Sequence, residues 1–280
     1  HLNADRLLRA GILYPKAGRH MLPTPAAQHQ FLVRSATADP TNRYGDRPRR
    51  ELEREIVATP HETLLLSAEY VSFQLFGEGN WAFPDYLRGL GYEVTLVVSV
   101  RPQADLTVSK YTQRIKNLRA CESFADFAGT VLPSRVHRYR AMAQDCGARG
   151  YGARFLPYNA EMRARGVELA FMAAALEIDG RLAADKQAAL MRALGARIPA
   201  RRNESTGTVE LALCRTLARE LNPDGALPQS QTQVLHNVVR SVMRRRPWFR
   251  DEPYRMRDTA LIERADALHG AENDAFAAAV

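Results

Sequence analysis

The chain has 280 residues and a formal net charge of +8, from 39 basic and 31 acidic side chains. This length can bury a full hydrophobic core. The longest apolar run, Leu169 to Leu176, is too short to span a membrane, and no secretory signal pattern opens the chain, so we expect a cytoplasmic protein. Cys121, Cys146 and Cys214 are too widely separated for a disulfide framework or a metal cluster, and we expect no metal.

The first half of the chain alternates short apolar runs with amphipathic stretches. These patterns predict helices over residues 2–10, 26–36, 50–58 and 81–89, and strands over residues 12–15 and 63–67. The run Val94 to Val100 is β-branched and almost wholly apolar, which is typical of a central parallel strand covered on both faces. Pro102 suits the first position of a helix over residues 102–118, because a proline there loses no hydrogen bond.

The second half of the chain is predicted to be almost entirely helical. The expected helices cover residues 123–146, 167–176, 183–194, 208–221, 231–245 and 259–279, and one strand is expected over residues 153–157. Strands confined to the first part and helices to the second predict an α/β domain over residues 1–222. Residues 223–280 would then form a helical extension packed on that domain.

Two side chains after the central strand point to a phosphate site. Arg101 ends the strand and Ser109 lies about two turns into the next helix, so a guanidinium and a hydroxyl can converge on one phosphate. Ligands of open α/β sheets bind at this edge. With Lys110 and Tyr111 following, the segment resembles the 3′-phosphate-binding element of sulfotransferases that use 3′-phosphoadenosine 5′-phosphosulfate (PAPS). The similarity to bacterial members covers most of residues 1–222 and includes Gln103, Gln113, Lys116, Asn203-Glu204-Ser205 and Leu221-Asn222.

The resemblance implies a three-layer α/β core of the P-loop nucleotide-kinase-like kind, with a central parallel sheet and a helical C-terminal flank. It also implies sulfuryl transfer from PAPS to a hydroxyl, with 3′-phosphoadenosine 5′-phosphate (PAP) as product, and we expect a carbohydrate or polysaccharide acceptor. Arg101 and Ser109 would bind the 3′-phosphate, helped by Lys110. Arg201 and Arg202 belong to a segment that closes over the nucleotide in related enzymes, and a phosphate contact is expected there.

Two residues compete for the role of catalytic base, which must take the acceptor proton. Glu69 lies at the carboxyl end of the strand 63–67, where many sulfotransferases carry the base. Its rival His29 lies on the helix 26–36, in a region that often faces the acceptor in this superfamily. The side chains that we expect to line the acceptor cleft are Tyr14, Arg19 and Tyr70.

In the resembling family a strand and a phosphate-cradling loop precede the first helix, and they hold the 5′-phosphosulfate. This sequence has no such loop, so we expect the 280 residues to be a fragment. The alternative is a non-catalytic binding or scaffold protein that keeps the fold. The run Arg244 to Arg250 interleaves arginines with aromatics as some nucleic-acid-binding surfaces do, but we expect no nucleic-acid partner.

Overall fold

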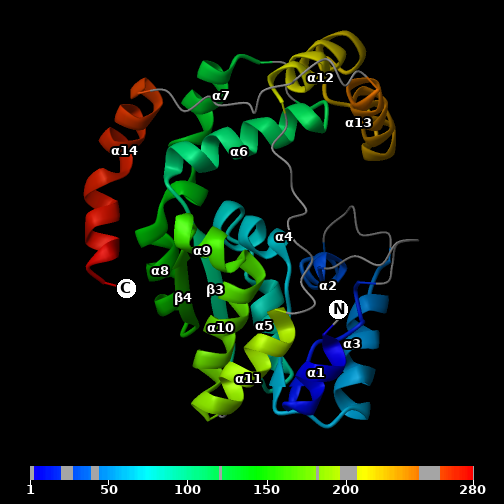
Figure 1. Ribbon diagram of the computed structural model, residues 1–280, viewed down its shortest axis with the longest axis vertical. Coiled ribbons are helices and arrows are strands. Elements are labelled where there is room, and N and C mark those ends of the chain that lie inside the picture. Colours follow the sequence, from blue (N-terminus) through cyan, green and yellow to red (C-terminus); the bar gives the residue numbers. More distant parts are fainter. Residues whose placement is uncertain are drawn as a thin grey trace. The chain divides into compact units, whose positions relative to one another are not determined.

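The computed structural model describes residues 3–19, 28–38, 44–119, 122–180, 183–195, 207–245 and 259–279. The chain divides into two compact units. Unit 1 comprises residues 1–100, 138–199 and 278–280, and unit 2 comprises residues 101–137 and 200–277. Helices dominate both units, and the described strands all belong to unit 1 (Figure 1). The predicted α/β class is therefore confirmed in its general form.

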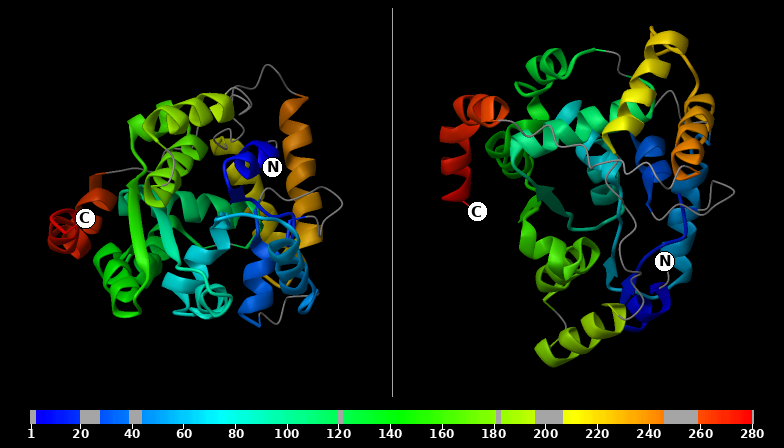
Figure 2. Two further views of the ribbon diagram at one scale, coloured as in Figure 1. Left: turned by 90° about the horizontal axis from the view of Figure 1, so that it is seen from below. Right: turned by 45° about the horizontal axis from the view of Figure 1, so that its top comes forward.

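The strands of unit 1 form two parallel pairs. In the first pair, β1 (Ile12–Leu13) lies beside β2 (Thr63–Leu64). In the second, β3 (Thr95–Val100) lies beside β4 (Gly152–Pro157), which are labelled in Figure 1 and can be followed by colour in the left view of Figure 2. Gly152 faces Thr95, and a Cβ at residue 152 would come 2.7 Å from the Thr95 Oγ1, so only glycine fits there without a shift.

The prediction for the central strand is correct in its direction but wrong in its surroundings. β3 runs parallel to β4, as expected. Among the described strands it has no second neighbour, and only Val98 of its six residues is buried. A continuous apolar run shows that a strand tolerates burial, but it does not specify how many strands flank it. The strands predicted over 12–15 and 63–67 are also shorter, with two residues each.

Two groups of packed, buried apolar side chains stand out in the described part of unit 1. Ala17, Leu32 and Leu52 are completely buried in one of them, and Leu7 packs with Leu176 in the other. Truncating a leucine at such a position to alanine costs about 2–5 kcal/mol.

The helical elements of this unit are α1 (Ala4–Arg9), α2 (Gln30–Ala36), α3 (Arg47–Ala58), α4 (Glu69–Ser72), the π-helical turn η1 (Phe73–Gly77), α5 (Ala82–Gly89), α8 (Tyr139–Ala148), α9 (Ala160–Arg165), α10 (Val167–Asp179) and α11 (Ala184–Gly195).

Unit 2 is built around α6 (Gln103–Lys116). One end of its apolar face packs Tyr111 and Ile115 against Leu211 and Cys214, and the other end packs Ala104 against Leu261. The other elements of this unit are α7 (Phe124–Val131), the 3₁₀ turn η2 (Arg135–His137), α12 (Thr208–Leu221), α13 (Gln229–Arg244) and α14 (Thr259–Ala277). The predicted boundary at residue 222 falls between α12 and α13, which pack against each other.

Most predicted helices are present, but three details differ. The helix expected over 123–146 is divided into α7, η2 and α8, because Pro133 has no amide hydrogen to continue the first helix. Pro102 lies just before α6, where its carbonyl oxygen accepts a hydrogen bond from the Leu106 amide, so it does not occupy the first helical position. The elements α4, η1 and α9 were not predicted.

In the described ranges no helix has both the length and the apolar character of a membrane span. Nor do His, Cys, Asp and Glu side chains of those ranges form a group of three or more that could hold a metal ion. The thiols of Cys146 and Cys214 are free and buried, and burial raises their pKa to about 11 and about 12. These two thiols are therefore inert at neutral pH.

Candidate functional site

Three of the predicted site residues meet in unit 1, where the chain leaves β1 and later enters α2. The Tyr14 ring lies edge-on to the His29 ring, with the centroids 4.8 Å apart. The Arg19 guanidinium carbon lies over the Tyr14 ring, 4.6 Å from its centroid. Tyr14, Arg19 and His29 therefore form one cluster, although 15 positions separate the first from the last.

His29 is fixed by hydrogen bonds at both ring nitrogens. The Ser67 backbone N–H donates to Nδ1 at 3.0 Å, so the ring proton is on Nε2, which donates to the Pro15 carbonyl oxygen at 3.0 Å. The side chain is completely buried, and burial is the main reason that its pKa falls to about 4, with nearby Arg19 lowering it further. The neutral ring thus ties the end of β1 to the segment after β2. The lone pair of Nδ1 already accepts the Ser67 hydrogen bond, so the ring has none left to take a proton from a substrate. This geometry favours a structural role for His29.

Arg19 is a buried cation, and two of its guanidinium nitrogens have no acceptor among the described residues. The residue is 5% exposed, and no described residue accepts a hydrogen bond from its Nε or Nη1. Burial raises the pKa of the Tyr14 hydroxyl, and Arg19 opposes that rise. Leaving guanidinium N–H groups buried without acceptors is costly. An anionic group of a ligand would satisfy them, and this fits the predicted role of Arg19 at an acceptor.

Glu69 and Tyr70 begin α4, next to this cluster. The Glu69 backbone N–H donates to the Gln28 Oε1 at 3.3 Å, so the residue before His29 contacts the rival candidate base. The Glu69 side chain is exposed, at the first turn of a helix. The Tyr70 hydroxyl accepts a hydrogen bond from Gln74 at 2.9 Å. Unlike His29, Glu69 has a carboxylate that an incoming hydroxyl can reach.

The loop after β1 is shaped by a carboxylate that the sequence did not reveal. Backbone amides of Lys16 and Ala17 donate to the two Glu55 carboxylate oxygens, at 2.8 Å and 2.7 Å. Gly18 follows with φ +71°, and a Cβ there would come 2.7 Å from the Leu32 side chain. These contacts place Arg19 over Tyr14. Glu55 belongs to α3, far along the chain from Lys16 and Ala17, so no local sequence pattern indicates this contact.

The second group of predicted residues surrounds α6 in unit 2. Arg101 follows the last residue of β3 and is partly buried. Ser109 lies on the exposed stripe of α6 with Gln113, one turn further on, while Thr107 and Tyr111 face the interior. Lys110 is partly buried, and burial lowers its pKa. β3 ends at Val100 and α6 begins at Gln103, so Arg101 and Pro102 form the connection between them. Arg201 and Arg202 lie outside the described residues.

A buried polar network that was not predicted holds the inner face of α6. The amides of Gln103 and Asn273 exchange hydrogen bonds of 2.8 Å and 3.1 Å, which join α6 to α14. The His137 Nε2 lies 3.2 Å from the Thr107 Oγ1. Burial lowers the pKa of His137 to about 3, with Lys110 and His269 contributing. By fixing the rotation of α6, this network keeps Ser109 on the exposed face.

In comparisons with protein-family models, curated proteins and solved structures, no significant match to the chain was found.

Proposed function

We propose that the protein is a PAPS-dependent sulfotransferase with a three-layer P-loop-like core. The observation that carries the proposal is the run from β3 through Arg101 and Pro102 into α6, with Ser109 exposed two turns along the helix. Guanidinium groups bind phosphate through hydrogen bonds between two ions, and a hydroxyl on the helix adds a hydrogen bond from an uncharged donor. Both groups suit the 3′-phosphate of the nucleotide, and the partly buried Lys110 adds a positive charge beside Ser109.

In this proposal the nucleotide supplies the sulfuryl group, and the protein positions the reactants. Arg101 and Ser109 hold the 3′-phosphate, while Arg201 and Arg202 contact a nucleotide phosphate. The acceptor oxygen bonds to sulfur as the bond from sulfur to the phosphate oxygen breaks, leaving PAP. Glu69 receives the acceptor proton, as a general base. Its exposed carboxylate supports this choice over His29, both of whose ring nitrogens are hydrogen-bonded.

The acceptor in this proposal is a carbohydrate hydroxyl. Tyr14 and Tyr70 supply aromatic surface, and Arg19 supplies buried guanidinium N–H groups for a carboxylate or sulfate on the sugar.

The decisive test is calorimetric binding of PAP beside adenosine 5′-phosphate, which lacks the 3′-phosphate. We expect PAP to bind at least tenfold more tightly, since only PAP offers a phosphate to Arg101 and Ser109. Equal affinities would contradict the proposal. Binding of PAP without sulfuryl transfer to any carbohydrate tested would favour the alternative, a sulfotransferase-like binding or scaffold protein.

Glu69→Gln separates the two candidate bases. The amide keeps the shape of the side chain but cannot accept the acceptor proton, so we expect sulfuryl transfer to fall a hundredfold or more. PAP affinity should stay within twofold, because the 3′-phosphate is bound elsewhere. The measurement is the single-turnover transfer rate, with Glu53→Gln as a control, since Glu53 is an exposed glutamate of α3. An unchanged rate in Glu69→Gln would exclude Glu69 as the base.

A further inference from the structure

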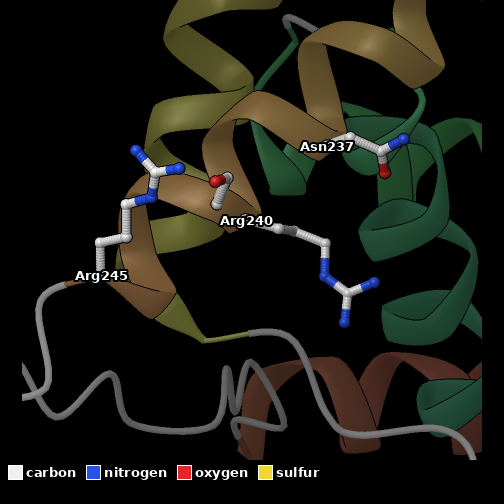
Figure 3. A pocket seen from close by; sticks show the side chains of 4 residues that line it. Asn237, Arg240 and Arg245 are labelled. Carbon is white, nitrogen blue, oxygen red and sulfur yellow. The ribbon is translucent and has the colours of Figure 1, made fainter.

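A groove in unit 1 is lined by three elements that follow one another along the chain, β4, α9 and α10 (labelled in Figure 1). Its volume is about 170 Å³. Ligand pockets usually enclose about 300–1,000 Å³, so this groove suits only a small molecule. The hollow on α13 differs, because its lining residues Asn237, Arg240, Ser241 and Arg245 are all exposed and belong to one helix and its C-cap (Figure 3). They can contact a ligand from one side only.

The walls of the groove in unit 1 are mainly aliphatic. Leu156 comes from β4, Met162 from α9, and Ala170, Ala173 and Ala174 from α10. The three alanines are spaced by three and four positions, so they lie on one face of the helix. Because an alanine side chain ends at its Cβ, this face leaves space next to the strand. Met162 and Ala174 are 6% and 3% exposed, so part of the wall is buried apolar surface.

Two carboxylates and one guanidinium complete the described lining. The Arg154 Nη2 of β4 lies 3.2 Å from the Glu177 Oε2 of α10, so these two charges compensate each other. Glu161 of α9 is exposed and supplies a further carboxylate, which leaves the described lining with a surplus negative charge. The sign is opposite to the net charge of +8 of the whole chain. The groove therefore favours a cation, although the chain as a whole attracts anions.

We propose that the groove binds a small aliphatic primary amine, with its ammonium group at Glu161 and its carbon chain along the alanines of α10. An ammonium group pairs with the surplus carboxylate, and the chain covers the aliphatic walls. The α10 face extends about 10 Å from Ala170 to Glu177, which is long enough for a short alkyl chain. A metal ion would satisfy the charge but would leave the apolar walls uncovered. The amine is opposite in charge to PAP, so its binding does not depend on the proposed sulfuryl transfer.

The test is NMR of the full chain with ¹³C-labelled methionine methyl groups, titrated with pentylamine. The Met162 methyl lies in the wall of the groove, and its signal is identified by its loss in Met162→Leu. We expect pentylamine to shift this signal saturably. Pentan-1-ol has the same chain without the charge and should bind at least tenfold more weakly. Pentanoate should not bind detectably, because its charge has the same sign as that of Glu161.

Glu161→Gln removes the surplus charge and should weaken pentylamine binding at least tenfold. The matched control Glu168→Gln removes the same charge from an exposed residue of α10 that does not line the groove, and it should bind within twofold of the wild type. Ala173→Leu fills the space beside Leu156 and should abolish the shift, while the Met162 signal still reports a folded protein.

Four results would each overturn the inference: no saturable shift in the wild type, equal affinity for pentan-1-ol, unchanged affinity in Glu161→Gln, or tighter binding of Nα-acetyllysine amide than of pentylamine. The last result would assign the groove to a lysine side chain of a partner protein and not to a free amine.

Discussion

Replacing Arg101 with alanine is expected to lower the affinity for PAP by a factor of ten to a hundred and to leave the affinity for adenosine 5′-phosphate unchanged. A charge-assisted hydrogen bond contributes about 1.5–3 kcal/mol, and a tenfold change in affinity corresponds to about 1.4 kcal/mol. Only PAP carries the phosphate that Arg101 would bind. The selectivity between the two nucleotides therefore reports on this contact, independently of any general loss of positive charge.

The matched control for this experiment is Arg219→Ala. Arg219 is an exposed arginine of the same unit, paired with its neighbour Glu220, and its removal should change neither affinity. Arg101→Lys should recover part of the PAP affinity, because lysine keeps the charge but lacks the planar fork of donors. Ser109→Ala should cost about tenfold, since it removes one hydrogen bond from an uncharged hydroxyl to the charged phosphate, worth about 1.5 kcal/mol. A selectivity for PAP that persists in Arg101→Ala would remove the central argument for a sulfotransferase.

The part of this element that was predictable is local. Short-range patterns predict a strand over Val94 to Val100 and a helix after Pro102. Both elements are present within a few residues of the predicted bounds. The number of strands beside β3 depends on residues far along the chain, so the apolar run did not determine it. The division of the expected helix 123–146 could have been predicted from the sequence, because Pro133 interrupts it.

The environment of each candidate side chain was not predictable. No residue near His29 in the sequence indicates that its two ring nitrogens hydrogen-bond to the Ser67 amide and the Pro15 carbonyl. These partners are brought together by the parallel pairing of β1 and β2. Arg19 was predicted as a substrate contact from its residue type alone. Its burial, and the lack of an acceptor for its Nε and Nη1 among the described residues, are properties of the packed loop.

His29→Ala is expected to destabilise unit 1 by about 3 kcal/mol or more. The variant leaves the buried Pro15 carbonyl without its ring partner, at about 1–3 kcal/mol, and it removes the acceptor of the Ser67 N–H. It also opens a cavity beside Tyr14. The measurement is native-state hydrogen exchange of the α2 amides, which reports on unit 1 directly. His61→Ala is the control, because His61 belongs to the same unit but is only partly buried.

The same substitution should remove part of the protein's acid sensitivity. The pKa of His29 is about 4 in the folded state against about 6.5 in the unfolded chain, so between these values the unfolded state binds the additional proton. Stability contributed by the neutral ring is therefore complete above pH 6.5 and declines as the pH falls toward 4. Between pH 7 and pH 5 the wild type should lose about 2 kcal/mol through this one histidine. That increment should be absent in His29→Ala, and an identical pH dependence in the two proteins would show that the ring is not held neutral in the folded state.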